Sequence, residues 1–358
     1  MNNDKFGIGV IGCGGIANSV HLPSLAKASG AYISALCDID SIKLKKTAEK
    51  YGVPESSCFT NYEDLISCQE VDAVDICTPN NLHCPMAAKA LFAKKPFCIE
   101  KPMGISAQEA KALKTAADKS GLPSMICFSY RFYPAVRYAK SLIDKGHLGN
   151  INTIYAQYLK SSAFIPGRRL DWRFEESKAR YGVSGDLAVH ILDIVRFLAG
   201  DITGVFAKTG IAVKKRMELG RDVLRNVTTD DYCNFLAEVE GGISATFGIS
   251  RCAYGNKNHI VVDIYGDKGA LRFDLNHSDQ IQVYVPDNTG VNEDMKTITV
   301  PDEYKSDQMQ TFVDILHKKQ PLYAPTLDEG LNCQYILDAL LASSEQCRWI
   351  DINNSRGN

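Results

Sequence analysis

Short apolar runs alternate with stretches of helical periodicity over the first third of the chain. The mostly apolar runs, typical of strands buried on both faces of a parallel sheet, fall at residues 6–11, 32–37, 72–78, 97–100 and 124–129. Helices are predicted between them at residues 40–51, 85–93 and 106–120. The last of these helices opens on a capping box, Ser106 with Glu109, and Gly121 follows its end. This alternation predicts an α/β fold with right-handed crossovers.

From residue 151 the runs lengthen, and apolar residues alternate with polar ones. This pattern predicts strands of a largely antiparallel sheet at residues 151–160, 202–213, 232–240, 243–250, 260–265, 270–273 and 281–285. Gly241 and Gly242 form the turn of one hairpin. Helices are expected at residues 135–144, 185–198, 306–318 and 327–344. The sequence therefore predicts a first domain over residues 1–130 and an α+β domain over residues 131–358, whose last helices are able to pack back on the first.

The length of 358 residues agrees with two domains. Because 40 basic residues nearly balance 42 acidic ones, the net charge does not indicate binding to nucleic acid or to an anionic membrane. There is no apolar run long enough to span a bilayer and no signal-peptide core before the first strand. We therefore expect a cytoplasmic protein.

The 12 cysteines include no C-x-x-C pair. Four of them, Cys37, Cys77, Cys98 and Cys127, fall in predicted strands, where cysteine behaves as a small apolar residue. Cys13 lies inside a glycine-rich turn at a variable position, so no chemistry is assigned to it. We interpret the cysteines as reduced core thiols, and no metal site is expected.

The first strand ends in a glycine pattern, since Gly12, Gly14 and Ala17 occupy the three positions of G-x-G-x-x-G/A. Gly12 permits a tight turn, Gly14 lets the backbone approach a pyrophosphate, and Ala17 lets the next helix pack closely. Gly15 and Ile16 open that helix, whose positive end would hold the phosphates. A plain structural turn is the alternative.

Asp38 ends the second strand, at the distance expected for the acid that binds a ribose. A carboxylate there accepts a hydrogen bond from the adenosine 2′-hydroxyl and repels a 2′-phosphate. Ile39 and Asp40 follow it, so no arginine is present to receive that phosphate. The sequence therefore predicts NAD in preference to NADP.

Two further stretches follow the next two strands of the first domain. The first contains Thr78, Pro79, Asn80 and His83, and the second is Glu100-Lys101-Pro102. In an open α/β sheet both belong at the carboxyl edge, beside the nicotinamide end of the cofactor. Pro102 keeps Lys101 out of helical geometry, so that the amine can point into a cleft. An ordinary surface lysine is the alternative interpretation.

The helix predicted at 185–198 carries Asp186 and His190 four residues apart on one face, with Asp193 near the same stripe. Histidine beside carboxylates suits proton transfer near neutral pH, although a capped helix with a buried histidine would look the same. Arg131, at the domain junction, reads equally well as a structural arginine. The long segment 161–182, which contains Trp172 and Arg173, is polar and aromatic enough to bind a polyhydroxylated ring or another subunit.

Taken in order, the stretches GVIGCGGIA, TPNNLH, EKP and GDLAVHILD, with the closing DEGLNCQYILDALLASSE, resemble the Gfo/Idh/MocA oxidoreductase family. The resemblance implies a Rossmann domain, an α+β domain with an open, mostly antiparallel sheet, and reversible oxidation of a sugar or cyclitol hydroxyl. It also implies that Lys101, Asp186 and His190 meet over the nicotinamide. Ala188 departs from the glycine found there in many members, which affects only the fine shape of the pocket.

From these patterns and the resemblance we predict three sets of site residues. The catalytic set is Lys101, Asp186 and His190. The cofactor set is Gly12, Gly14, Gly15, Ile16, Asp38, Thr78, Pro79, Asn80, His83, Glu100 and Lys101. The substrate set is Lys101, Arg131, Trp172, Arg173, Asp186 and His190.

The expected reaction is oxidation of a secondary hydroxyl of a glucose-type pyranose or its glycoside, with C3 as a candidate position and His190 as the base. A myo-inositol-like cyclitol is the second choice of substrate. An NAD-dependent glycosidase that oxidises its sugar only transiently, and a non-catalytic cofactor sensor, are alternatives from other classes.

An open sheet leaves one apolar face to be covered. Alternating apolar residues at Ile260, Val262, Ile264, Tyr232 and Phe235 are predicted to supply a face that pairs with another subunit. The family's tendency to form dimers and tetramers agrees with a homo-oligomer.

Overall fold

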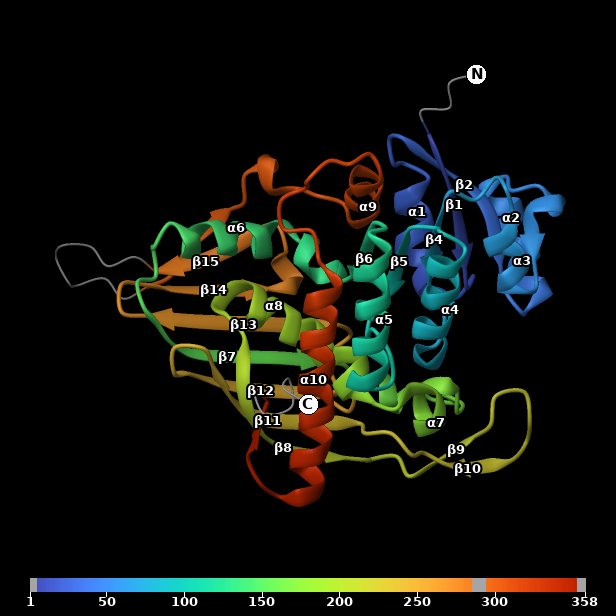
Figure 1. Cartoon of the computed structure of the whole chain (residues 1–358). Helices are drawn as coiled ribbons and strands as arrows, with labels where there is room; N and C mark the ends of the chain where they lie inside the picture. The colour runs from blue at the N-terminus through green and yellow to red at the C-terminus, as the bar shows by residue number, and fades with distance from the viewer. Residues whose placement is uncertain (1–4, 285–293, 353–358) are drawn as a thin grey trace. The chain divides into compact units, whose positions relative to one another are not determined.

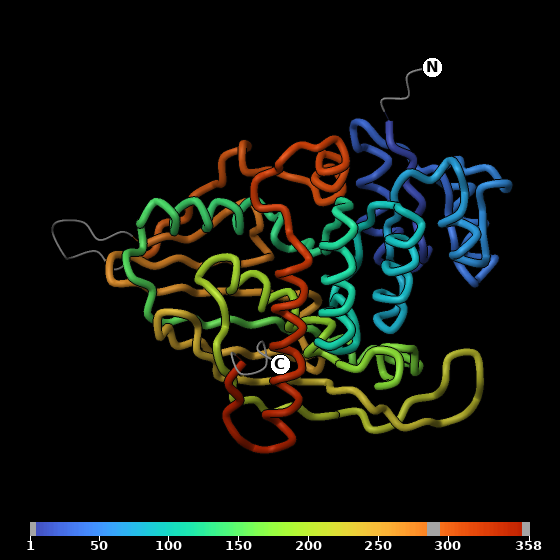
Figure 2. Tube along the Cα trace, viewed as in Figure 1, coloured from blue at the N-terminus to red at the C-terminus, as the bar shows by residue number. Residues whose placement is uncertain are grey.

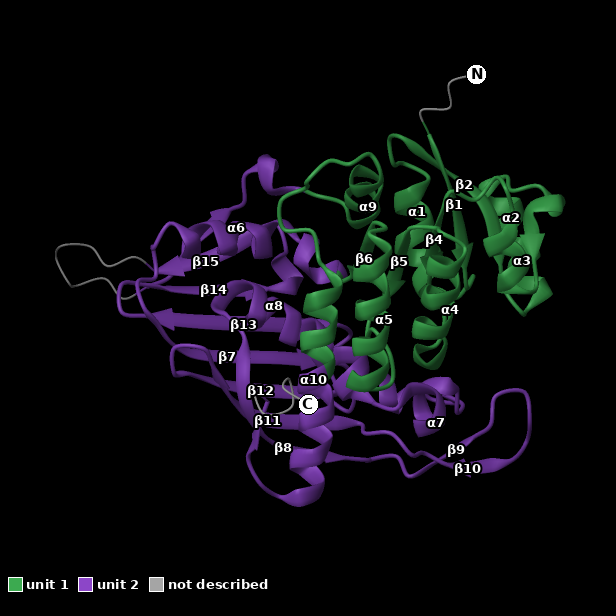
Figure 3. Cartoon of the chain, in the orientation of Figure 1, with its two compact units in different colours: residues 1–128, 306–334 green, residues 129–305, 335–358 purple. Residues whose placement is uncertain are grey.

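Two sheets organise the chain, one in each of two units (Figure 1). The structure is a computed structural model that describes residues 5–284 and 294–352. Unit 1 comprises residues 1–128 and 306–334, and unit 2 comprises residues 129–305 and 335–358, so the chain returns to unit 1 late. Figure 2 follows the course of the chain, and Figure 3 colours the two units. The segment 306–334, predicted as part of the second domain, thus belongs to unit 1. No helix within the described residues is both long and apolar enough to cross a membrane.

Unit 1 contains a six-stranded parallel sheet in the order β3-β2-β1-β4-β5-β6. Its strands are β1 (Phe6–Ile11), β2 (Ala31–Cys37), β3 (Cys58–Phe59), β4 (Ala73–Ile76), β5 (Phe97–Glu100) and β6 (Ser124–Cys127). The sequence predicted all of them except the two-residue β3. Because the strand order reverses between β1 and β4, a crevice for a ligand is expected at the carboxyl ends of these two strands.

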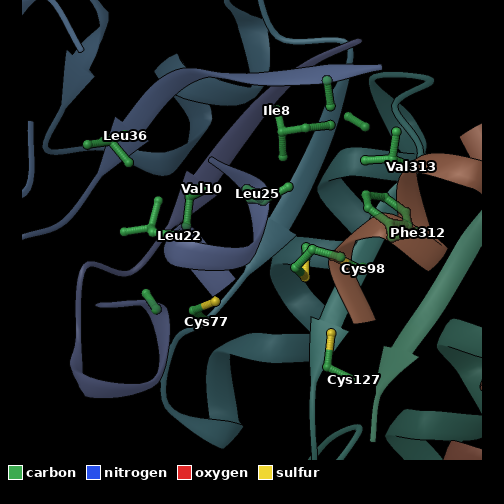
Figure 4. Close-up of a cluster of buried hydrophobic side chains, with 14 of the residues drawn as sticks. Ile8, Val10, Leu22, Leu25, Leu36, Cys77, Cys98, Cys127, Phe312 and Val313 are labelled. Carbon is green, nitrogen blue, oxygen red and sulfur yellow. The ribbon is translucent and has the colours of Figure 1, made fainter. Parts of the chain in front are cut away.

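The helices of unit 1 are α1 (Leu22–Leu25), α2 (Ser41–Tyr51), α3 (Tyr62–Ser67), α4 (Asn80–Phe92), α5 (Ala107–Ser120) and α9 (Gln308–Leu316). Three of them were predicted nearly at their observed bounds, but the helix predicted at 85–93 begins earlier, at Asn80, and contains Pro85, while α1 and α3 were not predicted. Asp40 caps α2, and the backbone N–H of Glu109 donates to the Ser106 hydroxyl at 3.2 Å, which confirms the predicted start of α5. Phe312 and Val313 of α9 belong to the same hydrophobic cluster as Ile8 and Cys98 (Figure 4).

Unit 2 is built on a nine-stranded sheet in the order β16-β15-β14-β13-β7-β12-β11-β8-β17, in which only the β7–β12 pair is parallel among the described strands. The strands are β7 (Ile151–Leu159), β8 (Ile202–Gly210), β11 (Tyr232–Val239), β12 (Ile243–Ser250), β13 (His259–Gly266), β14 (Ala270–Asp274), β15 (Gln280–Tyr284), β16 (Lys296–Thr299) and β17 (Ile350–Asp351). Val285, predicted to end one strand, lies outside the described residues. Gly241 and Gly242 both have left-handed φ values, 82° and 79°, as the predicted hairpin turn requires.

The helices of unit 2 are α6 (Pro134–Asp144), α7 (Glu176–Ala179) and α8 (Val189–Ala199), while α10 (Leu327–Gln346) is shared between the two units. A separate two-stranded ribbon pairs β9 (Lys215–Met217) with β10 (Leu224–Asn226). The helix predicted from residue 185 begins differently from our expectation, because Ser184–Ala188 forms a π-helical turn and regular α geometry starts at Val189. A π-helical turn contains more residues than an α-helical turn. The four-residue spacing from which we predicted a shared face for Asp186 and His190 therefore does not apply across it.

The prediction of the exposed sheet face is wrong. Ile260, Val262 and Ile264 are fully buried, and they pair in register with the buried residues of β7, the strand that α8 contacts. Tyr232 and Phe235 are three positions apart on β11 and so point to opposite faces of the sheet. The prediction failed because alternation shows that a strand has two faces but not which face the helices of the same unit cover.

Candidate functional site

The glycine loop of unit 1 runs from the end of β1 into a π-helical turn, Ala17–His21. Gly12 has a φ of 97°, and a Cβ there would lie 2.7 Å from the carbonyl oxygen of Cys77, which follows β4. A side chain at Gly14 or Gly15 would instead point into open space, with no heavy atom within 4 Å. The loop therefore packs tightly against β4 on one side and leaves its backbone open on the other, which fits an approaching pyrophosphate.

Asp38 lies directly beside this loop. One oxygen of its carboxylate accepts the backbone N–H of Cys13 at 2.8 Å, and the other accepts that of Asp40 at 2.8 Å. Burial and, less strongly, the Asp38 charge raise the pKa of the Cys13 thiol to about 12, so the thiol stays protonated at neutral pH. Asp38 thus fixes the loop and presents a carboxylate at the end of β2, the position that a ribose diol requires.

The two stretches that follow β4 and β5 are joined by His83. Its Nε2 lies 2.8 Å from the carbonyl oxygen of Thr78, and its Nδ1 lies 2.8 Å from that of Pro102. Burial lowers the pKa of His83, an effect that the two carbonyls oppose and the nearby Lys101 charge reinforces. A neutral imidazole has one N–H, so His83 donates to one of these carbonyls and lies against the other, which makes it a link between the two loops and favours an indirect effect on the cofactor.

Glu100 ends β5 and is buried, so it does not present its carboxylate to a ligand. Its Oε1 pairs with His21, and its Oε2 accepts the backbone N–H of Lys101 at 3.2 Å. The Lys101–Pro102 peptide bond is cis, and the Lys101 residue is half-buried. Unit 1 therefore places Lys101 two strands along the carboxyl edge from the glycine loop, in the order β1-β4-β5.

In unit 2 the side chains of Trp172, Arg173 and Asp186 gather at the start of the helix. The Arg173 guanidinium lies 4.3 Å from the centre of the Trp172 ring, and its Nε lies 3.9 Å from Asp186 Oδ1. Both charged side chains are more than one-third exposed. This trio offers an aromatic face together with a hydrogen-bond donor and an acceptor, which suits a ring with several hydroxyls.

His190 lies on the first turn of α8 among aromatic side chains. Its ring and that of Tyr130 are nearly perpendicular with their centres 4.6 Å apart, and the Tyr130 hydroxyl lies 2.9 Å from that of Tyr158. Asn258 closes the group, because it donates to the Tyr130 hydroxyl and accepts from Tyr158 at 2.7 Å. Burial, followed by the charges of Tyr130 and Asp186 among others, raises the pKa of Tyr158, so this hydroxyl stays protonated. Our sequence interpretation missed Tyr158 and Asn258, although Tyr158 occupies an inward position of an alternating strand.

Arg131 is placed differently from the rest of the predicted substrate set. Its guanidinium is buried, makes two hydrogen bonds with the carboxylate of Asp193, and lies over the ring of Phe197 at 4.7 Å. Asp193 is also buried and so is committed to this pair. The structure supports the structural interpretation of Arg131, because the pair holds α8 against the segment that begins unit 2.

The remaining predicted residues of unit 1 lie at the starts of two helical elements. Pro79 precedes α4 and Asn80 begins it, while Ile16 precedes the turn that contains His21. Unit 1 brings together the glycine loop, Asp38, Thr78 and Lys101 at the carboxyl edge of its sheet. Unit 2 brings together Trp172, Arg173 and Asp186, and separately places His190 beside the tyrosines.

A parallel sheet with its strand order reversed beside a glycine loop, and an acid after the second strand, defines a dinucleotide-binding protein of the Rossmann class. Residues 6–128 match the family described as "Oxidoreductase family, NAD-binding Rossmann fold", and residues 136–272 match the "GFO/IDH/MocA C-terminal domain". The chain belongs to the Gfo/Idh/MocA family of oxidoreductases, and unit 1 contains its NAD-binding domain.

Similar proteins include two curated relatives and a solved structure. Levoglucosan dehydrogenase of Pseudarthrobacter phenanthrenivorans is 27% identical over 338 residues, which cover 86% of each chain. Glucose-6-phosphate 3-dehydrogenase of Bacillus subtilis is 28% identical over 278 residues, or 77% of this chain and 76% of the relative. A structure of levoglucosan dehydrogenase in complex with NADH and L-sorbose has a TM-score of 0.88 at 25% identity, and it covers 97% of this chain and 99% of its own.

Proposed function

We propose that the chain is an NAD-dependent dehydrogenase that oxidises a secondary hydroxyl of a sugar or glycoside, with C3 of a glucose-type pyranose as the first position to test. The observation that carries the proposal is that the glycine loop and Lys101 lie at the same carboxyl edge of the unit 1 sheet, two strands apart. Both curated relatives named above are sugar-related dehydrogenases by name, and one of those names specifies position 3. A sugar therefore fits better than a cyclitol, which stays the second candidate.

The proposed roles follow from the chemistry of each side chain. Bound NAD⁺ supplies the acceptor for the hydride that leaves the carbinol carbon. His190 takes the proton of the same hydroxyl, and the Lys101 amine donates a hydrogen bond to the oxygen as negative charge develops on it. The C–H and O–H bonds break as the C=O bond forms, so each turnover yields a ketone, NADH and one proton.

Substrate contacts are proposed for the exposed trio in unit 2. Asp186 would accept from a sugar hydroxyl, Arg173 would donate to another, and the Trp172 ring would cover an apolar face of the pyranose. Arg131 is left out of this set because Asp193 and the protein interior occupy its guanidinium.

The proposal is tested by screening sugars, glycosides and inositols with NAD⁺ while absorbance at the NADH band is followed. Stoichiometric NADH accumulation with a sugar, accompanied by a keto sugar in the mass spectrum, is the expected result. Cleavage of a glycosidic bond without NADH accumulation would instead show the glycosidase. NAD⁺ binding without turnover on any of these compounds would favour the cofactor sensor.

Asp38 should determine the choice between the two nicotinamide cofactors. We expect Asp38→Asn to reduce the preference for NAD over NADP by about 10-fold in kcat/KM, because the amide keeps an acceptor for one of the two backbone N–H groups but no longer repels a 2′-phosphate. Asp40→Asn is the matched control, since Asp40 is partly exposed and caps α2 two residues away. Equal efficiency of the wild-type protein with both cofactors would contradict this prediction.

We also propose that the chain forms a homo-oligomer through the exposed face of the unit 2 sheet. Tyr155, Thr246, Leu236 and Phe206 stand in register across four neighbouring strands, and Tyr155 and Leu236 are 50% and 51% exposed. A row of this kind is apolar enough to pair with a second copy. The family resemblance suggests a dimer or tetramer, and the predicted cytoplasmic location stays a prediction.

Light scattering after size exclusion should show an oligomer that Leu236→Glu converts to a smaller species. Phe92→Glu is the control, because Phe92 is 86% exposed at the end of α4 in unit 1. A wild-type monomer at micromolar concentration would overturn the proposed interface.

A further inference from the structure

A buried histidine in unit 1 has no part in the proposed reaction. His21 ends the π-helical turn that follows the glycine loop, and its side chain is fully buried. Nδ1 lies 2.9 Å from Asp75 Oδ2, and Nε2 lies 2.9 Å from Glu100 Oε1. Asp75 comes from β4 and Glu100 from β5, so one imidazole joins the helix after the loop to two neighbouring strands.

The partners of His21 determine its protonation state. Carboxylates only accept hydrogen bonds, so a carboxylate at each ring nitrogen requires a proton on both. Burial opposes the charged ring, but the charges of Asp75 and Cys77 and the hydrogen bonds to these side chains raise the pKa of His21 well above its ordinary value. The thiols of Cys77 and Cys98 also face Asp75, at 3.6 and 3.2 Å from Oδ1. The cluster is therefore an imidazolium held between two buried carboxylates.

Glu100 connects this cluster to the lysine. While Oε1 pairs with His21, Oε2 accepts the backbone N–H of Lys101, so both carboxylate oxygens are engaged. On the other side of Lys101, the carbonyl oxygen of Pro102 lies 2.8 Å from Nδ1 of the buried His83 ring. The backbone that carries the Lys101 amine is thus fixed from both directions, and one of these two supports depends on the orientation that His21 gives to Glu100.

We propose that His21 is a positioning residue for Lys101, which it acts on through the Glu100 carboxylate. The inference rests on the proposed function, because it assigns His21 a role only through the amine of Lys101. The backbone N–H of Asn18, in the same turn as His21, donates to the Gly14 carbonyl at 3.1 Å. His21 thereby sets the lysine relative to the loop that holds the pyrophosphate, and small displacements of a reacting group are costly.

A double-mutant cycle tests this coupling. His21→Gln keeps much of the side-chain volume without the charge, and it should slow NAD⁺ reduction in single turnovers by about 10- to 100-fold while the Kd for NAD⁺ changes less than about threefold. In a Lys101→Ala background the same substitution should cost less than about threefold. Equal losses in both backgrounds would overturn the inference. Full activity of Lys101→Ala alone would instead reject the proposed function.

A second measurement requires neither substrate nor a mutation that removes His21. In the nucleotide-free wild-type protein labelled with ¹⁵N-histidine, both ring nitrogens of His21 should keep their protonated NMR shifts at pH 8. Glu100→Gln should allow the ring to lose a proton in this range, because one carboxylate is gone. Glu109→Gln is the matched control, since Glu109 is a half-buried carboxylate of the same unit that accepts the backbone N–H of Ile105. A neutral ring in the wild-type protein would overturn the proposal.

One competing interpretation of the cluster uses the same residues. The ligand atoms of His21, Asp75 and Cys127 all lie within 4.8 Å of one another, a spacing that a metal ion could bridge. The paired carboxylates on His21 favour the imidazolium, which has no lone pair for a metal. One equivalent of transition metal in the purified protein would therefore count against the positioning role.

Discussion

Replacing Lys101 with alanine should lower turnover of the sugar by about 10²- to 10⁴-fold. The amine is the only group we assign to the charge that develops on the substrate oxygen, and alanine offers no donor in its place. The contact between Glu100 and residue 101 uses the backbone N–H, so the substitution leaves that support in place. The Kd for NAD⁺, measured by calorimetry, should therefore change less than about threefold.

Two further variants separate the loss of the Lys101 charge from general damage to the protein. Lys101→Met removes the charge but keeps most of the volume, and it should be as inactive as the alanine variant. Lys89→Ala removes a partly exposed lysine of α4 that pairs with Glu63, so it should leave turnover unchanged. If Lys101→Ala kept its turnover, or lost affinity for NAD⁺ in proportion, Lys101 would have no role in the chemistry.

The parallel sheet of unit 1 could be predicted from the sequence because its signals are local. Each buried strand is a short apolar run, and the crossover helices α2 and α5 carry their own caps, Asp40 and Ser106. The glycine pattern is equally local, since its residues directly follow β1, although the close approach that Gly12 permits is to Cys77 after β4. Loops at the carboxyl edge follow from strand order alone, which placed Lys101 near the glycine loop without coordinates.

The pairing of distant residues could not be predicted in the same way. Arg131 and Asp193 are 62 positions apart, and nothing near either one indicates the other. The side chain of Arg131 therefore looked available for substrate until burial showed otherwise. The π-helical turn at Ser184–Ala188 is likewise set by tertiary anchors, because Asp230 accepts the backbone N–H groups of Gly182 and Ser184 at its start.

One signal of the buried cluster was present in the sequence but was not used. Asp75 interrupts the apolar strand AVDI, and an ionisable side chain in a fully buried strand requires a partner of opposite charge. The sequence alone does not name that partner, since His21 lies 54 positions away in a different element. A buried acid in a parallel strand is thus a reason to look for a histidine or arginine near the preceding loop.

The second large effect is expected for His190→Ala, which should lower turnover by about 10²- to 10⁴-fold because no other group in the proposed mechanism accepts the hydroxyl proton. The imidazole packs nearly perpendicular to the Tyr130 ring and is largely buried, so its removal leaves a space of matching shape. Added imidazole should enter that space and restore part of the rate. The rescue should grow with pH, because only the neutral form of imidazole can accept the proton.

The control for this substitution is His147→Ala, which removes an exposed histidine of the same unit and should change neither turnover nor rescue. A structural role for His190 would give a different pattern, since loss of packing against Tyr130 would lower the melting temperature and imidazole would not restore the rate. The decisive comparison is therefore the rate with and without imidazole at several pH values, measured on a folded variant. A fully active His190→Ala protein would show that another group is the base, and the hydroxyl of Tyr130, 2.9 Å from that of Tyr158, would be the next group to test.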